Sequence, residues 1–181
     1  MFIKICGITT VEQIDAAADL GYSAAGIVLH KNSPRCCTPG KAAALAEYAA
    51  GRIVTVAVAL KYEEIAEAEK AFDLIQLYEF LDDERLIFSG DTPPPEGRLY
   101  RYFMHDTSRG SGKTEVFPSY PDKIKKRLIL SGGLNCDNVV TVVKNFSPAG
   151  VDVSSGVEKI RGVKDIKLME RFIREVNNAY K

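Results

Sequence analysis

With 181 residues, 46% of them hydrophobic, the chain is long enough for one domain with a sizeable core, spanning residues 1–181. Its 24 Lys and Arg residues balance its 24 Asp and Glu residues, so the composition does not point to a polyanionic partner such as nucleic acid. No run of ~18 apolar residues predicts a membrane span, and the start MFIKICG predicts a strand rather than a secretory signal.

Cysteine usage predicts a cytoplasmic protein with free thiols and no bound metal. The four cysteines form no C-x-x-C pair, and only two histidines are present to complete a zinc site. We interpret the adjacent Cys36 and Cys37 as ordinary loop thiols, and a redox pair is the alternative.

The first half of the chain predicts alternating strands and helices. After a strand at Phe2–Cys6, Thr10 and Gln13 have the spacing of a capping box, and Gly21 ends that helix. Thr38, followed by Pro39, begins a second helix. Further strands are predicted at Ala24–Leu29, Ile53–Leu60 and Asp73–Tyr78, with an acidic helix from about Tyr62 to Phe72.

The helical pattern is interrupted in the second half. Strands are predicted at Arg85–Phe88 and Leu99–His105, but three consecutive prolines between them exclude a regular helix. The stretch Phe80–Glu84 is too short for more than one turn. The remaining predicted elements are a strand at Arg127–Leu130, a helix around Asn138–Lys144, a strand at Gly150–Val153 and a helix from about Lys164 to Asn178.

Eight strands alternating with helices predict a closed, parallel (β/α)8 TIM barrel. Such barrels usually have about 250 residues and seldom fewer than about 200. We therefore expect the fourth and fifth helices to be shortened or missing. The alternative is an open doubly wound sheet, although no G-x-G-x-x-G follows the first strand.

Polar side chains at strand ends predict an active site at the barrel mouth. Alternation along a strand sends one side chain outward to the helices and the next into the barrel. The inward, polar sides are formed by Lys4 with Cys6, Gln76 with Tyr78, and Asp152 with Ser154. Asp106 closes the sixth strand, which turns His105 to the outer layer. Taken singly, Cys6 also fits a buried core position and Asp106 a turn cap.

Three turns rich in Gly and Ser predict a phosphate cradle. They are Gly110–Thr114, Ser131–Gly133 and Ser154–Gly156, which follow the sixth, seventh and eighth strands. Backbone N–H groups and hydroxyls bind phosphate, and barrels often place that site after strands seven and eight. Glycine also simply makes turns, so the argument depends on two such turns occurring after the right pair of strands.

Taken together, these motifs resemble phosphoribosylanthranilate isomerase, an enzyme of tryptophan biosynthesis. The matching segments are Lys4-Ile5-Cys6-Gly7-Ile8-Thr9, Ser33-Pro34-Arg35, Gly110-Ser111-Gly112-Lys113-Thr114, Leu130-Ser131-Gly132-Gly133-Leu134, Val151–Glu158 and Gly162-Val163-Lys164-Asp165. They run in order from the first residues to the last helix, and the middle of the chain, from about Tyr78 to Met104, is not covered.

The resemblance implies an Amadori rearrangement of N-(5-phosphoribosyl)anthranilate to 1-(o-carboxyphenylamino)-1-deoxyribulose 5-phosphate, with no cofactor. It implies Cys6 as general base, Asp106 as general acid and Arg35 at the anthranilate end of the substrate. The other implied substrate residues are Asp152, Gly110 and Gly112, with Gly132, Gly133, Ser154, Ser155 and Gly156 around the phosphate. The ligand is then a small phosphosugar, and the chain is a monomer or a homodimer that covers the eroded edge.

The proposed chemistry makes a demand on the environment of Cys6. A thiol with an unperturbed pKa of about 8.5 is mostly protonated at neutral pH, so a base there needs a positive field. Lys4, Arg35 and helix N-termini are the expected sources, and Asp152 opposes them.

One departure from the family stands out. The family usually has Gln-Leu-His-Gly where this chain has Gln76-Leu77-Tyr78-Glu79. We expect this change to leave the two proton-transfer residues untouched. The alternatives are the related isomerase of histidine biosynthesis, which typically uses a pair of aspartates, and a catalytically impaired barrel that binds a phosphorylated ligand or a partner protein.

Overall fold

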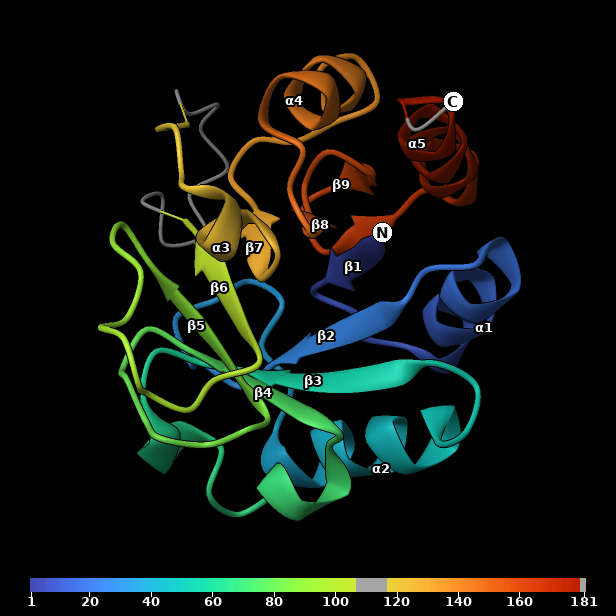
Figure 1. Ribbon diagram of the computed structural model, residues 1–181. Coiled ribbons are helices and arrows are strands. Elements are labelled where there is room, and N and C mark those ends of the chain that lie inside the picture. Colours follow the sequence, from blue (N-terminus) through green and yellow to red (C-terminus); the bar gives the residue numbers. More distant parts are fainter. Residues whose placement is uncertain (107–116, 180–181) are drawn as a thin grey trace.

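The computed structural model describes residues 1–106 and 117–179. Within them, eight parallel strands pair in chain order and close into a barrel (Figure 1). The strands are β1 Phe2–Cys6, β2 Ala24–Val28, β3 Val54–Val58, β4 Leu74–Leu77, β5 Leu86–Gly90, β6 Tyr102–His105, β7 Leu128–Leu130 and β8 Gly150–Val153. The predicted (β/α)8 barrel is confirmed, and the open doubly wound sheet is excluded.

Regular helices cover only part of the barrel. They are α1 Val11–Leu20, α2 Pro39–Ala49, α3 Asp122–Lys125, α4 Val139–Phe146 and α5 Ile166–Ala179. In Figure 1, α1, α2, α4 and α5 lie around one side of the barrel, whereas loops face the side of β5 and β6. The Thr10 and Thr38 side chains accept backbone N–H groups as predicted N-caps, and Gly21 has a left-handed φ of 86°. The second half of the predicted capping box differs, because the Gln13 side chain accepts the N–H of Thr9 instead of that of Thr10.

The predicted acidic helix from Tyr62 to Phe72 is wrong. The segment forms two short 3-10 turns, η1 Tyr62–Glu64 and η2 Glu69–Ala71. The Glu64 carboxylate accepts the backbone N–H groups of Leu60 and Lys61, and it also pairs with His30 at 2.6 Å. The bonds to the backbone form a capping box at the first turn, and the segment then continues to β4 through 3-10 turns, which cover more length per residue than an α-helix.

The fourth and fifth helices are missing, as predicted, and aromatic side chains cover the strands there instead. Phe80 packs edge-to-face on Phe88, which in turn stacks near Phe103, with ring centroids 5.4 and 6.3 Å apart. Arg98 lies over the Phe80 ring. On the neighbouring strand, His105 faces the outer layer as expected and hydrogen-bonds to Tyr120 at 2.7 Å. Each large ring buries much apolar area, so a few loop residues take over the covering role of a helix.

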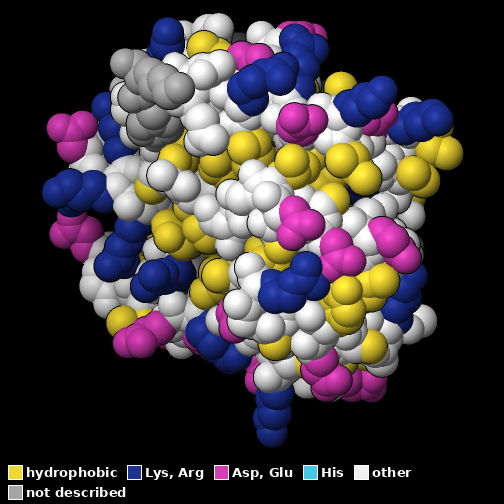
Figure 2. Space-filling model, turned by 90° about the vertical axis from the view of Figure 1, so that its right-hand side faces the viewer, with side chains coloured by type: hydrophobic (Ala, Val, Ile, Leu, Met, Phe, Trp, Pro, Cys, Tyr) yellow, Lys and Arg dark blue, Asp and Glu magenta, His cyan; other side chains and the backbone are white. Residues whose placement is uncertain are grey.

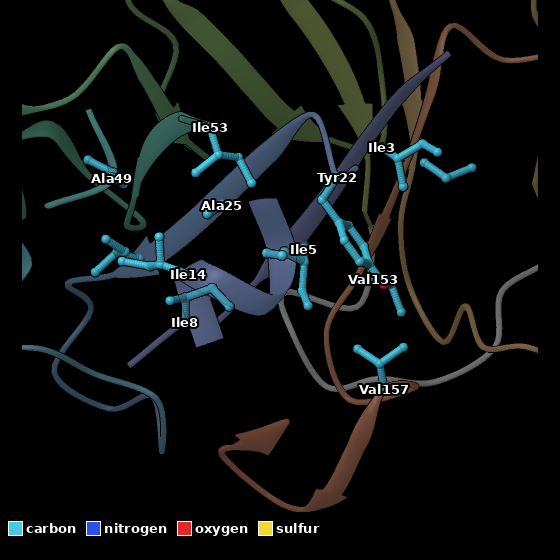
Figure 3. Packing of buried hydrophobic residues seen from close by; sticks show 14 of the residues in the cluster. Ile3, Ile5, Ile8, Ile14, Tyr22, Ala25, Ala49, Ile53, Val153 and Val157 are labelled. Atoms are coloured by element: carbon cyan, nitrogen blue, oxygen red, sulfur yellow. The ribbon is translucent and has the colours of Figure 1, made fainter. Parts of the chain in front are cut away.

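Side chains alternate between two apolar layers, as the sequence predicts. Ile5 and Ala25 point outward from β1 and β2 and pack with Ile14 of α1, in a cluster shown in Figure 3. A second cluster fills the inside of the barrel and includes Val56, Ile87, Met104 and Ile129. The polar residues of the barrel interior therefore lie above an apolar floor.

The surface carries charges of both signs, with apolar patches between them on the face shown in Figure 2. Among the described residues, Ile160, Val163 and Ile166 are the exposed large apolar side chains nearest one another in sequence. No described helix is long and apolar enough to cross a membrane.

Barrel closure depends on close backbone approach at Gly150, which pairs with Phe2. A Cβ at Gly150 would lie 2.5 Å from the Phe2 carbonyl oxygen, whereas a Cβ at Gly40 in α2 would meet nothing within 4 Å. We expect Gly150→Ala to lower the free energy of unfolding by about 1–3 kcal/mol, because the backbone must shift. Gly40→Ala is the matched control and should be neutral or stabilising by up to about 1 kcal/mol. Urea denaturation measures both, and equal effects would contradict this role of Gly150 in closure.

Candidate active site

One cavity opens at the carboxyl ends of the strands, and most of the predicted site residues line it. Its volume is about 370 Å³. The predicted residues around it are Cys6, Arg35, Asp106, Gly132, Gly133, Asp152, Ser154 and Ser155. Gly156 is not among the lining residues, and the predicted Gly110 and Gly112 lie outside the described part of the chain.

A buried ion pair lies beneath Cys6. The Lys4 side chain is fully buried inside the barrel, and its Nζ contacts Asp152 Oδ1 at 2.8 Å. The Ser131 hydroxyl donates to the other carboxylate oxygen of Asp152 at 3.1 Å. Gly26 of β2 leaves space for this arrangement, because a Cβ there would lie 3.0 Å from Lys4 Nζ and 3.2 Å from Cys6 Sγ. The ammonium group and the thiol are therefore near neighbours.

The environment raises the pKa of the Cys6 thiol above its usual value. Burial is the largest cause, because it penalises the thiolate, and Asp152 acts in the same direction. Lys4 lowers the pKa, as predicted, and so does Lys164. Burial outweighs the two lysines, so the Cys6 side chain is a neutral thiol held beside Lys4 and Lys164.

Arg35 is part of a second charged network. Its Nε and Nη2 each donate to a carboxylate oxygen of Glu158 at 2.6 Å. Lys164 Nζ binds the same carboxylate at 2.9 Å and the Cys6 carbonyl at 2.6 Å. Burial raises the pKa of Glu158, but Arg35 and Lys164 outweigh it and bring that pKa to about 2. Glu158 therefore stays ionised and holds both cations in place, of which Arg35 lines the cavity.

Backbone conformation explains the position of Arg35. Gly7, directly after Cys6, has a left-handed φ of 83°, and the N–H groups of Gly7 and Ile8 both donate to the Gly26 carbonyl. A Cβ at Gly7 would overlap Arg35 Cδ. Only glycine lets the chain turn here while the Arg35 side chain passes beneath it.

The turns after β7 and β8 have the features of an anion site. Gly132 and Gly133 have left-handed φ values of 95° and 66°. Their N–H groups and that of Ser155 donate no hydrogen bond to another described residue. Backbone N–H groups that line a cavity and have no protein acceptor there fit an anionic ligand.

Ser154 and Gly156 have structural positions beside these turns. The Ser154 hydroxyl donates to the Cys6 carbonyl at 2.9 Å, so it ties β8 to β1. A Cβ at Gly156 would overlap the Leu134 carbonyl oxygen. Gly156 therefore lets the turn after β8 approach the turn after β7.

Comparisons with a family model and with related sequences point to the same family. Residues 3–93 and 101–175 match the family described as N-(5'phosphoribosyl)anthranilate (PRA) isomerase. The N-(5'-phosphoribosyl)anthranilate isomerase of Thiobacillus denitrificans is 32% identical, and the alignment covers 96% of both chains. That of Dechloromonas aromatica is 31% identical over 98% of this chain and 96% of its own. The chain belongs to the phosphoribosylanthranilate isomerase family.

Solved structures of several proteins are similar to this one over nearly its whole length. TrpF from Jonesia denitrificans has a TM-score of 0.81 and 30% identity, covering 99% of this chain and 98% of its own. Phosphoribosyl anthranilate isomerase from Thermus thermophilus has a TM-score of 0.76 and 26% identity, covering 98% and 99%. A further phosphoribosyl anthranilate isomerase, 25% identical with a TM-score of 0.73, is in complex with reduced 1-(o-carboxyphenylamino)-1-deoxyribulose 5-phosphate and covers 98% and 99%.

The departure from the family at Tyr78 reaches the centre of the site, which corrects our expectation that it would not. The Tyr78 hydroxyl donates to Asp106 Oδ2 at 2.5 Å. Burial and the neighbouring Asp106 raise the pKa of Tyr78, so the hydroxyl keeps its proton. The residue that replaces the usual histidine of the isomerase family thus binds the predicted general acid.

Sequence reasoning also missed the roles of Glu158 and Lys164. Both lie in a small antiparallel hairpin, β9 Glu158–Ile160 and β10 Val163–Lys164. Periodicity places Lys164 at the start of the last predicted helix, which in fact begins at Ile166. The available signal was the opposite charges of Glu158 and Lys164, which both lie in segments that match the isomerase family. Periodicity, however, does not reveal a strand of two residues.

The Lys4 charge should set how readily Cys6 ionises. Replacing Lys4 by Met removes a cation that lowers the pKa of Cys6 and leaves Asp152, which raises it. The pH midpoint for alkylation of Cys6 by iodoacetamide, followed by mass spectrometry of the Cys6 peptide, should therefore move upward. Lys144→Met, in α4, is the control and should leave the midpoint in place.

The same substitution should also lower stability by about 3–5 kcal/mol, because it leaves a buried carboxylate without its partner. Lys4→Met combined with Asp152→Asn removes both charges and should recover part of that loss in urea denaturation. An unchanged Cys6 midpoint in Lys4→Met would contradict the assigned electrostatics.

Proposed function

We propose that the protein isomerises N-(5'-phosphoribosyl)anthranilate to 1-(o-carboxyphenylamino)-1-deoxyribulose 5-phosphate, in the biosynthesis of tryptophan. The observation that carries the proposal is one cavity that brings together a thiol, a carboxyl group and turn amides with no acceptor among the described residues. Membership of the isomerase family supports it. The relatives bearing that name align over nearly the whole chain.

Asp106 acts as the general acid in this proposal. Its protonated carboxyl group donates to the furanose ring oxygen while the bond from that oxygen to C1 breaks. The lone pair of the anthranilate nitrogen then forms the C=N bond of a protonated Schiff base. The Tyr78 hydroxyl donates to Oδ2 of Asp106, which stabilises the carboxylate once the proton has left.

Cys6 acts as the general base in the second step. Its thiol first loses its proton to solvent at the cavity mouth. As a thiolate it then removes the proton from C2 of the sugar. The electrons of the C–H bond form the C1=C2 bond of the enolamine while the C=N π electrons return to nitrogen, and the enolamine tautomerises to the ketone. Lys4 and Lys164 stabilise the thiolate against the penalty of burial. General acid–base help of this kind is typically worth ~10²–10⁴-fold per group.

The substrate is held at its two charged ends. The phosphate lies on the N–H groups of Gly132, Gly133 and Ser155. Ser154 ties β8 to β1, and Gly156 lets the turns after β7 and β8 approach each other. Arg35 contributes its remaining N–H groups to the anthranilate end. Gln76 lines the cavity with a buried Oε1 that has no hydrogen-bond partner among the described residues, so it suits a sugar hydroxyl.

The expectations for cofactor, ligand, location and oligomeric state are part of what we propose. The reaction needs no cofactor, the ligand is a small phosphosugar, and the protein works in the cytoplasm as a monomer or homodimer. A barrel that binds a phosphorylated ligand without turning it over is the second candidate. The observation that favours this second role is the exchange of the usual histidine for Tyr78, which contacts Asp106.

Removing either proton-transfer group should abolish most of the activity. We expect Cys6→Ser and Asp106→Asn each to lower kcat by at least ~10²-fold. The fluorescence of phosphoribosylanthranilate, which falls as it is consumed, measures the rate. Cys136→Ser, at a buried thiol outside the cavity, is the control for Cys6 and should keep its activity. No turnover by the unaltered protein would leave the binding role ahead, and full activity in Cys6→Ser would rule out Cys6 as the base.

Tyr78 should affect the chemical step more than substrate binding. Tyr78→Phe removes the hydrogen bond to Asp106 but keeps the ring, so we expect kcat to fall by roughly 10-fold with KM changed by less than about 2-fold. Tyr22→Phe is the matched control, because the Tyr22 hydroxyl binds the Met169 carbonyl and lies outside the cavity. It should lower stability by about 1 kcal/mol and leave kcat unchanged. A Tyr78→Phe variant with the kcat of the unaltered protein would show that the contact plays no part in the reaction.

A further inference from the structure

The hairpin β9–β10 reaches over the barrel mouth toward the loop after β2. Its turn contains Arg161 and Gly162, and an ideal Cβ at Gly162 would lie 3.7 Å from the Pro34 carbonyl oxygen. Arg161 lines the cavity together with Pro34 and Arg35. The turn therefore brings a cation from the segment after β8 to the end of the cavity that the second loop forms.

Arg161 differs from the other cations near this end because its charge is not used within the described part of the chain. No hydrogen bond or ion pair joins it to another described residue, and it is exposed. Arg35 has two of its N–H groups on Glu158. Lys164 donates to Glu158, to the Cys6 carbonyl and to the Ser154 carbonyl. Of the described cations that line the cavity, Arg161 thus has the most donors available for a ligand.

The wall beside these arginines is apolar. Val28 at the end of β2 and Val58, Ala59 and Leu60 at the end of β3 line the same cavity. The turn amides of Gly132 and Gly133 follow β7. In the strand order, β8 and β1 separate β7 from β2 and β3, which carry the apolar wall. A ligand with an aromatic ring on this wall, a carboxylate toward the arginines and a phosphate on the turn amides fits both ends.

We infer that Arg161 binds the carboxylate of the N-aryl group and thereby makes the hairpin a determinant of specificity for N-(carboxyaryl) over plain N-aryl ribosylamine phosphates. This inference rests on the proposed function for the identity of the substrate. Arg35, fixed by Glu158, forms the rigid side of the carboxylate site, and Arg161 closes the exposed side.

The test crosses a protein variant with a ligand variant. The ligands are two reduced products that cannot react further, N-(2-carboxyphenyl)- and N-phenyl-1-amino-1-deoxyribitol 5-phosphate, with Kd measured by calorimetry. Arg161→Gln should weaken binding of the carboxylated ligand roughly 10-fold or more, since it removes a charge-assisted hydrogen bond. It should change binding of the phenyl ligand by less than about 2-fold. The Kd of Arg161→Lys for the carboxylated ligand should lie between those of the unaltered protein and Arg161→Gln.

Control measurements distinguish a contact with the carboxylate from a general loss of binding. Lys159→Gln, at an exposed position of the same hairpin that does not line the cavity, should leave both Kd values unchanged. Equal weakening of both ligands by Arg161→Gln, together with weaker binding of inorganic phosphate, would place Arg161 at the phosphate and overturn the inference. Unchanged binding of the carboxylated ligand would also overturn it. Turnover of phosphoribosylanthranilate by the unaltered protein is measured separately, so a failure of the proposed reaction is distinguishable from a failure of this contact.

Discussion

The buried pair of Lys4 and Asp152 connects the closure of the barrel to its chemistry. The two residues stand opposite each other where β1 and β8 pair, at the seam between the first and last strands. A charged pair in a closed barrel is not by itself a large source of stability, because both groups have lost their hydration. The pair does, however, constrain the residues around it. The ammonium group must stay inside, Gly26 must remain small to admit it, and the Cys6 thiol directly above experiences its charge.

The opposite side of the barrel holds Asp106, the proposed general acid, by different means. There the chain lacks the fourth and fifth helices, and rings such as Phe80, Phe88 and Tyr120 cover the strands. Tyr78 at the end of β4 binds Asp106 at the end of β6, so their hydrogen bond spans the intervening strand β5 across the mouth. A short barrel can thus position its proposed acid through a side-chain contact at the mouth, while loops pack on the outside of these strands.

Features with a local cause could be predicted from the sequence, and those that depend on contacts distant in sequence could not. The capping residues Thr10 and Thr38 act within four positions, and strand alternation decides that Cys6 faces inward and His105 outward. The segment Tyr62–Phe72 has helical composition, yet Glu64 binds His30, which is 34 residues away.

The active site shows the same division. The cavity collects most of the predicted residues because strand ends converge in any barrel. The hydrogen bond from Tyr78 to Asp106 joins residues 28 positions apart, and the ion pair of Arg35 with Glu158 joins residues 123 positions apart. Neither contact leaves a periodic trace in the sequence, where Tyr78 is visible only as a departure from the family.

The electrostatics of the cavity impose an order on the proposed reaction. Burial already raises the pKa of Cys6, and a phosphate and a carboxylate entering the cavity add negative charge, which disfavours the thiolate further. Proton donation by Asp106 reverses this trend, because opening the ring places the positive charge of the protonated Schiff base next to C2. That charge both acidifies the C2 proton and stabilises the thiolate that removes it, and the burial of Cys6 strengthens the interaction. The acid step must therefore come first, and the neutral resting thiol is compatible with a base that is needed only after the ring has opened.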